Sequence, residues 1–279
     1  MSFAETDAAV SPEDLLRQRY RMDWKTPVQW NPVLETLIGH RSVRHFLPKA
    51  LPEGTLELLV AAAQSASTSS NMQLWSVVAI EDQERKARLA ELAAGQKHIR
   101  EAPLFLAWLA DLRRVRALGE ARNAEMIGPD YLEMGMVAMI DAALAAQNAF
   151  AAMESLGLGG VYIGALRNHP EQVAEELGLP DNVFCVFGLC VGYPDPAAGE
   201  AIKPRLPQSA VLYREQYGET PDPAEIAAYD TRLREFQNEQ RMNGIDWSTQ
   251  MVNRAGHLKG LMGRERMREA LANLGFPLK

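Results

Sequence analysis

The sequence predicts an α+β fold in which helices cover a sheet, and three observations point to it. Candidate helices and strands follow one another without the regular strand–helix–strand alternation of a doubly wound fold. Of the 279 residues, 47% are apolar, which is enough for a sizeable core. The longest apolar stretch, residues 134–153, contains Asp141, Gln147 and Asn148, and it is therefore predicted as a central core helix instead of a membrane span.

The helices predicted in the first half of the chain carry signals at their ends. We expect one helix over 12–21 and another over 32–38. The second has Asn31 as a possible N-cap, Pro32 at its first position and Gly39 at the C′ position. The remaining elements predicted in this half are helices over 53–64 and 83–94 and strands over 73–80 and 104–110.

The second half is predicted to be mainly helical around one further strand. Residues 112–129 are arginine-rich and poorly periodic, so we expect an irregular excursion there. A long helix over 131–156, a helix over 170–177 and a strand over 183–191 follow. Residues 222–279 are polar and mostly helical, and such a tail needs a surface to lie on, which could be a partner subunit.

The charge of the chain excludes two classes of partner. Its formal net charge is −7, whereas nucleic acids and anionic membranes select for basic surfaces. We therefore expect no nucleic-acid and no membrane partner, and a smaller ligand instead. The first residues provide neither a basic segment nor an apolar one, so no secretory signal is predicted and the cytoplasm is the expected location.

Cysteine and histidine spacing gives no indication of a metal or redox site. Cys185 and Cys190 lie in the apolar run VFCVFGLCVG, and their five-residue spacing predicts side chains on opposite faces of a strand. We expect buried free thiols, because neither a CxxC pair nor histidine spacing typical of metal ligands occurs.

The segment GHRSVRHF, residues 39–46, sets four potentially cationic side chains within six residues: His40, Arg41, Arg44 and His45. In a helix the cations on one face would repel by about 0.2–0.5 kcal/mol per pair. In an extended loop after a helix end, the guanidinium groups and the Ser42 hydroxyl can instead converge on one dianion. A solvated basic turn is the alternative.

A second cationic segment, KPRLP, occupies residues 203–207. Its prolines fix φ, so Lys203 and Arg205 form a stiff cationic edge with little chain entropy to lose. Alone it can be an ordinary loop with surface charges. Together with Arg41 and Arg44 it would close a phosphate site from two sides.

Two further segments have the composition of ligand contacts. The hydroxyls and the amide of STSSN, residues 67–71, can bond the polar edge of a ligand, although they equally form turns between a helix and a strand. Four glycines in GLGGVYIGALRN, residues 157–168, permit close backbone approach to a flat ligand. This stretch follows a helix, so it is not a dinucleotide-binding fingerprint.

The sequence indicates no certain catalytic side chain. Asp141 and Glu133 lie on the long predicted helix, and either can be a partly buried carboxylate with a shifted pKa. A carboxylate satisfied by core or interface partners is the alternative. No nucleophile elbow is present and no motif pairs a cysteine with a histidine.

Six segments, in this order, resemble the FMN-dependent nitroreductase family, in particular its oxygen-insensitive NADPH nitroreductase and NADPH–flavin reductase branch. They are GHRSVRHF, STSSNMQ, AGQKH, AQNAFAAMESLGLGGVYIGALRN, FGLCVGYP and KPRLPQS. The resemblance covers about residues 32–217. It implies a mixed central sheet flanked by helices in an intertwined homodimer, with two FMN sites at the interface, each built from both chains.

The resemblance also implies a domain organisation. Residues 1–30 would be an N-terminal extension and residues 31–217 the FMN-binding core. Residues 218–279 would be a helical C-terminal extension that packs on the core or on the partner subunit, within a single domain overall.

Site residues are implied by the same matches. The expected contacts of the FMN phosphate and ribityl chain are His40, Arg41, Ser42 and Arg44, with Lys203 and Arg205 reaching the phosphate and the ring edge. Thr68, Ser69 and Gln96 would bond the ribityl or pyrimidine side, and the backbone of Tyr162, Ile163, Gly164 and Ala165 would lie along the ring. Thr68 stands for a serine of the family and Ala165 for a glycine. Arg241 is the expected contact of the NADPH 2′-phosphate.

The activity implied is a ping-pong, two-electron reduction of nitroaromatics, quinones or related acceptors, with FMN as cofactor and NADPH or NADH as co-substrate. Lys203 or Arg205 would stabilise negative charge on the reduced flavin. One alternative is an NADPH–flavin reductase that supplies reduced flavin to a partner. Another is a non-catalytic FMN-binding protein.

Overall fold

The computed structural model describes residues 11–23, 29–218 and 221–279. The chain forms two compact units. Unit 1 contains residues 1–41 and 199–260, and unit 2 contains residues 42–198 and 261–279. The expected N-terminal extension lies partly outside the described residues, and the division into extension, core and C-terminal extension stays a prediction.

Among the described residues of unit 2, four strands form one sheet in the order β1-β2-β4-β3. The strands are β1 Trp75–Ile80, β2 Leu104–Asp111, β3 Gly159–Ile163 and β4 Val183–Gly192. All three strand pairs are antiparallel. Two isolated bridges lie outside these strand pairs, a parallel one between Ser42 and Gly160 and an antiparallel one between Phe46 and Pro194. The predicted α+β fold is confirmed.

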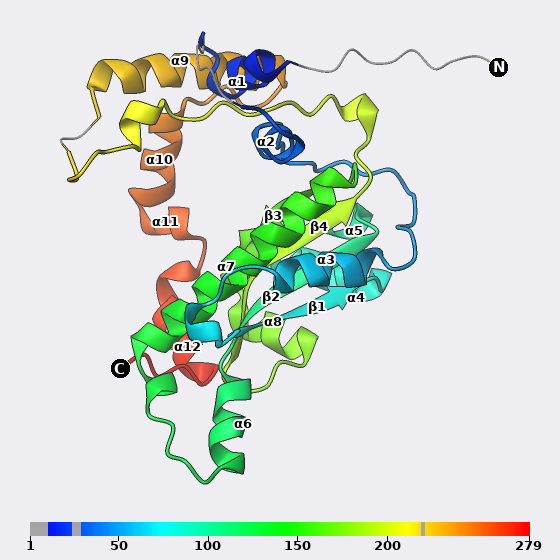
Figure 1. Ribbon diagram of the computed structural model, residues 1–279, viewed down its shortest axis with the longest axis vertical. Coiled ribbons are helices and arrows are strands. Elements are labelled where there is room, and N and C mark those ends of the chain that lie inside the picture. Colours follow the sequence, from blue (N-terminus) through cyan, green and yellow to red (C-terminus); the bar gives the residue numbers. More distant parts are fainter. Residues whose placement is uncertain (1–10, 24–28, 219–220) are drawn as a thin grey trace. The chain divides into compact units, whose positions relative to one another are not determined.

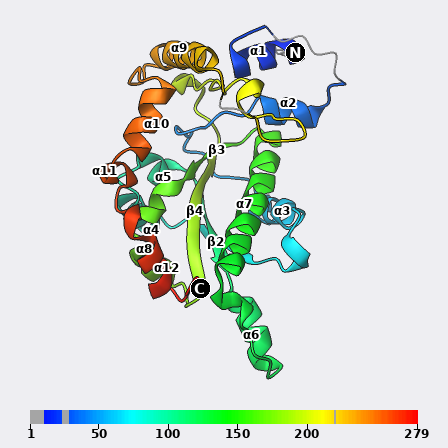
Figure 2. The same ribbon diagram turned by 90° about the vertical axis from the view of Figure 1, so that its left-hand side faces the viewer.

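Helices cover both faces of this sheet (Figures 1 and 2). One face carries α3 Thr55–Gln64 and α7 Leu132–Ser155, and the other carries α4 Gln83–Leu92, α5 Lys97–Glu101 and α8 Pro170–Leu177. Leu59 of α3 and Phe150 of α7 pack in one core cluster with Trp108 of β2. On the other face Leu89 of α4 packs in a cluster with Phe105 of β2. The buried apolar side chains of these two layers stabilise the unit.

The long helix α7 has the length and apolarity of a membrane span, and half of its most apolar window is buried inside the protein. Its buried residues include Ala138, Ala142, Ala149 and Phe150, which face the sheet. The predicted core helix over 131–156 therefore forms with boundaries within one residue of those expected.

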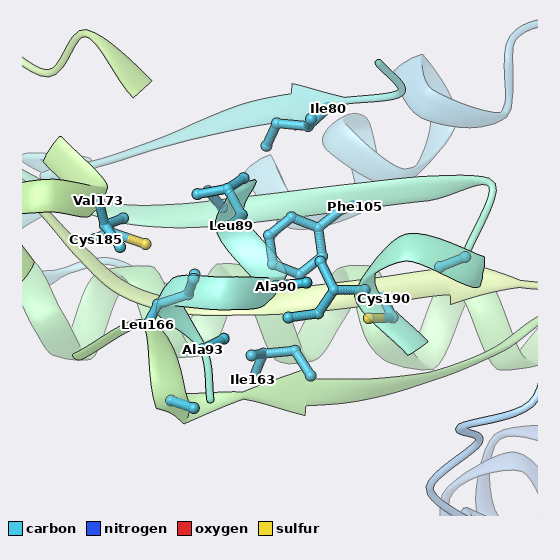
Figure 3. Close-up of a cluster of buried hydrophobic side chains, with 14 of the residues drawn as sticks. Ile80, Leu89, Ala90, Ala93, Phe105, Ile163, Leu166, Val173, Cys185 and Cys190 are labelled. Carbon is cyan, nitrogen blue, oxygen red and sulfur yellow. The ribbon is translucent and has the colours of Figure 1, made fainter. Parts of the chain in front are cut away.

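The prediction that Cys185 and Cys190 point to opposite faces is wrong. Both thiols lie in the same buried cluster, as Figure 3 shows. In β4 the register shifts by one residue, so that Trp108 pairs with Phe187 and Leu109 pairs with Cys185. This bulge adds one residue to the alternation and returns both cysteines to one face. Both are buried and free, as expected.

The irregular excursion predicted over 112–129 contains a helix, α6 Arg113–Ala121. Asp111, at the end of β2, accepts the backbone N–H groups of Arg113 at 3.0 Å and Arg114 at 3.4 Å. An acceptor for these free N–H groups starts the helix in spite of its clustered arginines. At the C-terminal end, α12 Met267–Asn273 and Phe276 pack in a cluster with Phe184 of β4.

Unit 1 is built from helices around a small core. They are α1 Pro12–Tyr20, α2 Pro32–Ile38, α9 Pro223–Glu239 and α10 Trp247–Ala255, while α11 Leu258–Leu261 crosses the boundary between the units. Tyr229, Leu233 and Phe236 of α9 form its buried cluster. The tail beyond residue 222 is mostly helical, as predicted.

The predicted caps of α2 are largely confirmed. Asn31 Oδ1 accepts the N–H of Leu34 at 3.0 Å, and Pro32 opens the helix. Gly39 ends it with φ of −72°, a right-handed conformation, so the left-handed stop for which glycine is suited does not form. Short 3₁₀ turns lie at Ser69–Asn71, Gly128–Asp130, Gly164–Asn168, Pro196–Ala198, Gln208–Ala210 and Arg264–Arg266.

Candidate functional site

In unit 1 a buried arginine joins the two cationic segments singled out in the sequence. Arg19, at the end of α1, is 6% exposed. Its Nη1 donates to the carbonyl of Lys203 at 2.8 Å, and its Nη2 donates to the carbonyls of Ile38 at 2.9 Å and His40 at 2.5 Å. The Arg205 N–H donates to the carbonyl of Arg19 at 2.9 Å. His40 and Lys203 are therefore held on the same guanidinium group.

A pocket of about 460 Å³ opens beside the second segment, within unit 1. Lys203 and Arg205 line it together with the aromatic rings of Tyr20, Tyr229 and Trp247. The residues that line this pocket include no carboxylate. Two cations and aromatic rings in the wall of one pocket favour a planar or anionic ligand.

Tyr229 keeps the segment KPRLP in place. Its hydroxyl donates to the carbonyl of Pro204 at 3.1 Å. Burial raises the pKa of Tyr229, against the opposing effect of the Arg205 charge, so the hydroxyl stays protonated and continues to donate. The stiffness expected from the prolines is thus reinforced by a tertiary hydrogen bond.

In unit 2 the segment after Arg41 is bound to the edge of the sheet. The N–H of Val43 donates to the carbonyl of Gly160 at 2.9 Å, and the side chain of Val43 is 1% exposed. A Cβ atom at Gly159 would lie 2.6 Å from Cγ2 of Val43, so glycine is needed for this close approach. With Val43 facing inward, its neighbour Arg44 is exposed.

Arg44 lies in the electrostatic environment of His98, which connects GHRSVRHF with the segment AGQKH. Burial and the positive charge of Arg44 lower the pKa of His98 from 6.5 to about 4, so the ring is neutral at neutral pH. His98 Nε2 lies 3.0 Å from Oε1 of Gln96. Because an amide oxygen only accepts, Nε2 carries the proton. The amide group of Gln96 is thereby oriented.

The serine-rich loop is held by the buried carboxylate of Asp141. Asp141 is 1% exposed and accepts the Thr68 hydroxyl at 2.5 Å and the N–H groups of Ser69 at 3.2 Å and Leu74 at 3.1 Å. The Thr68 oxygen also accepts the N–H of Gln73 at 2.9 Å. Thr68 therefore has no proton left to donate to a ligand, whereas Ser69 is exposed.

This loop contains an unusual run of backbone conformations. Ser70, Asn71 and Gln73 have φ values of 48°, 55° and 52°. Left-handed conformations are uncommon in residues other than glycine, and they persist where surrounding contacts determine them. The bonds to Asp141 bracket this run on both sides. Of the two carboxylates considered in the sequence, Asp141 is the satisfied core group, and Glu133 is exposed.

The turn at the end of β3 presents backbone more than side chains. Ile163 is 1% exposed and Ala165 is 7% exposed, and both pack in the apolar cluster of Figure 3. The extra methyl group of Ala165 is thus accommodated by the core. Tyr162 faces the other side of the sheet, where its ring stacks on that of Phe150 with 5.1 Å between the ring centroids. Gly164, the residue after Ile163, is partly buried.

The structure thus gathers the predicted residues into two sets. In unit 1 the basic set contains His40 and Arg41 with Lys203 and Arg205. In unit 2 the loop set contains Ser42, Arg44, Thr68, Ser69, Gln96 and the backbone of residues 162–165. Arg241 is exposed just after α9 in unit 1. Among the described residues no group of three or more metal-ligating side chains occurs.

The donor chemistry of each set, taken by itself, fits a part of FMN. Guanidinium and ammonium groups suit a phosphate monoester, and hydroxyl, amide and backbone N–H groups suit a polyol and a pyrimidine edge. Sequence reasoning missed Arg19, whose acceptors lie 19, 21 and 184 residues away. It also gave no role to His98, although the spacing QKH already placed it two residues from Gln96.

Comparisons with known proteins give a consistent result. Residues 37–193 match the model of the nitroreductase family, and residues 203–279 match that of the nitroreductase family C-terminal domain. An FMN reductase (NADPH) of Bacillus subtilis is 39% identical over 231 residues, covering 80% of this chain and 91% of the relative. An oxygen-insensitive NADPH nitroreductase of Salmonella typhimurium is 41% identical, covering 74% of this chain and 82% of the relative.

Solved structures agree. A nitroreductase of Bacillus subtilis has a TM-score of 0.82 at 36% identity. The match covers 88% of this chain and 100% of the chain of that structure. The NADPH:FMN oxidoreductase of Vibrio harveyi, solved as a complex with NAD⁺, has a TM-score of 0.79 at 31% identity, covering 89% of this chain and 100% of its own.

Proposed function

Because this chain belongs to the nitroreductase family, we propose that it is an FMN-dependent oxidoreductase that uses NADPH or NADH to reduce nitroaromatics, quinones or related acceptors. The relatives support the reaction class, since they are named as an FMN reductase and a nitroreductase. The observation that carries the proposal is the pair of cationic segments held on Arg19, which suits a phosphate group.

We propose that the basic set and the loop set hold FMN. His40, Arg41, Ser42, Arg44, Lys203 and Arg205 would bind the phosphate and its surroundings, while Ser69, Gln96 and the backbone of residues 162–165 would bind the ribityl chain and the ring. Thr68 is proposed as an acceptor only, because its proton is used by Asp141. Ala165 and Ile163 contribute backbone, since their side chains are in the core.

When bound, FMN supplies the two-electron chemistry, and the protein provides binding, orientation and electrostatics. Lys203 and Arg205 would stabilise negative charge on the reduced flavin. His98, neutral at neutral pH, orients the Gln96 amide without adding a further positive charge. Arg241 is our candidate for the NADPH 2′-phosphate because it is exposed at the end of α9.

We further propose a homodimer, and α7 supports it. Leu132, Met136, Ile140 and Leu144 recur every four residues along α7 and are 48%, 47%, 52% and 44% exposed. Such spacing places them on one face of a helix, and a continuous apolar stripe is typical of a protein interface. The cytoplasm is the proposed location, in agreement with the two buried free thiols.

Anaerobic mixing of the purified yellow protein with NADPH tests the proposal. We expect the flavin absorption band to bleach and to recover when a nitroaromatic is added. Persistent colour would favour the non-catalytic FMN-binding protein. Faster reoxidation by free FMN than by a nitroaromatic would favour a flavin reductase that supplies a partner. A protein that has no flavin bands and binds no added FMN would overturn the proposal.

A further inference from the structure

The helix α1 lies outside the part of the chain that matches the family. The two family models match residues 37–193 and 203–279, whereas α1 spans Pro12–Tyr20. The contacts of α1 nevertheless reach both cationic segments of the basic set. The match to the family models therefore says nothing about what this helix does.

Arg19 makes these contacts from a buried position. The side chain is 6% exposed, and its guanidinium donates to the carbonyls of Ile38, His40 and Lys203. The reciprocal bond from the Arg205 N–H to the Arg19 carbonyl fixes the helix end to the same segment. A buried guanidinium is costly unless its donors are satisfied, so the three carbonyls are held to it tightly.

This arrangement determines how the cationic residues are presented. The guanidinium is planar, so its Nη1 and Nη2 groups fix the separation between the carbonyls of Lys203 and His40. The peptide unit is planar and trans, so the N–H of Arg41 points away from Arg19 once the carbonyl of His40 is fixed. The ring of Tyr20, the next residue, lines the pocket beside Lys203 and Arg205.

We propose that α1 is a strap whose Arg19 holds GHR, residues 39–41, and KPR, residues 203–205, at the spacing that selects a phosphate monoester. Arg19 is thus a positioning residue, because its side-chain donors are directed at backbone carbonyls and it acts through His40, Arg41, Lys203 and Arg205. The inference rests on the proposed function, in which these four residues bind the FMN phosphate. Preorganisation of this kind raises affinity by reducing the ordering that binding requires.

The test compares FMN with riboflavin, which lacks the phosphate. Dissociation constants of both flavins for the apoprotein are measured by quenching of flavin fluorescence, for wild type, Arg19→Ala and Arg19→Lys. We expect Arg19→Ala to weaken FMN binding about tenfold or more while riboflavin binding changes little, so the preference for FMN falls. Arg19→Lys keeps the charge without the planar fork, so its preference should be intermediate.

Arg17→Ala is the matched control. Arg17 lies on the same helix but is exposed and pairs with Asp14 at 2.6 Å, so its loss leaves the bonds of Arg19 in place. We expect its flavin affinities to equal those of wild type. If Arg19→Ala fails to fold, as circular dichroism would reveal, Arg19→Lys carries the comparison.

The outcomes separate the strap from the proposed function. An unchanged preference for FMN in folded Arg19→Ala, or in Arg19→Lys where Arg19→Ala fails to fold, would overturn the strap. So would an equal loss of both flavins, which indicates general loosening of unit 1. A wild-type protein that binds riboflavin as tightly as FMN would instead overturn the phosphate assignment itself.

Discussion

The hydroxyl of Thr68 donates a 2.5 Å hydrogen bond to Oδ2 of Asp141, 73 residues further along the chain. The same carboxylate accepts the N–H groups of Ser69 and Leu74. Helix α7 thus fixes the loop that carries the exposed hydroxyl of Ser69, and it does so with a group that no ligand needs to touch. The conformation of this part of the candidate site therefore depends on a hydrogen-bonded carboxylate in the core.

Replacement of Asp141 by Ala should destabilise the protein by about 2–4 kcal/mol, because it leaves at least two N–H groups of a left-handed loop without an acceptor. The free energy of unfolding in urea measures this loss. Glu133→Ala, on the exposed face of the same helix, should remain near wild type. Equal unfolding midpoints for Asp141→Ala and wild type would show that the loop does not depend on this carboxylate.

His98 should make stability depend on pH. Its pKa is about 4 in the folded protein and 6.5 without burial and Arg44. Between these values the unfolded chain binds a proton that the folded protein does not. Protonation of the unfolded chain therefore lowers the free energy of unfolding as the pH falls from about 6.5 towards about 4. Above about pH 6.5 His98 is neutral in both states, so this loss of stability is absent. Thermal unfolding at about pH 7 and about pH 5 should show a larger decrease for wild type than for His98→Gln.

The exposed His257 provides the control for this titration. His257→Gln should retain the wild-type decrease between the two pH values. If His98→Gln also retained the full decrease, another group would be responsible for it.

The elements that sequence could predict are those whose signals are local. Both ends of α8 Pro170–Leu177 were expected, and α7 differs from its prediction by one residue at each end, because apolar periodicity and caps lie within the helix itself. The face of Cys190 could not be predicted, because a bulge in the pairing of β4 with β2 reverses the alternation. Such a bulge is a property of two strands together.

The candidate site shows the same division. The cationic segments and the serine-rich loop were visible as composition, and their contacts with FMN stay a prediction. The residues that hold these segments in place could not be identified from the sequence. Arg19 looks like any arginine of a polar helix until its acceptors, up to 184 residues distant, are brought next to it. For Asp141 the sequence left open a carboxylate with a shifted pKa and a satisfied core carboxylate, and only the folded loop shows which N–H and O–H groups it accepts.

Arg44→Ala should weaken FMN retention about tenfold or more, through loss of a charge-assisted phosphate contact of about 1.5–3 kcal/mol. It should also raise the pKa of His98, because the Arg44 charge is one of the causes that lower it. Flavin content after dilution and the NMR titration of His98 measure the two effects. Arg100→Ala, which removes an exposed arginine paired with Glu91, is the control.

The two measurements divide the possible outcomes. Stoichiometric FMN in diluted Arg44→Ala would contradict the phosphate assignment. An unchanged pKa of His98 would contradict the electrostatic coupling of the two residues within unit 2.

Ile140→Glu should convert the proposed homodimer into monomers. Ile140 is 52% exposed near the middle of the apolar stripe on α7, and a carboxylate there would be desolvated without a partner if two copies of the stripe met. Sedimentation at micromolar protein concentrations measures the change. Leu118→Glu is the control, because Leu118 is 56% exposed on α6, a helix that does not carry the stripe, and its replacement should leave the dimer intact. Persistence of the dimer in Ile140→Glu would place the interface elsewhere, and a monomeric wild type would contradict the homodimer itself.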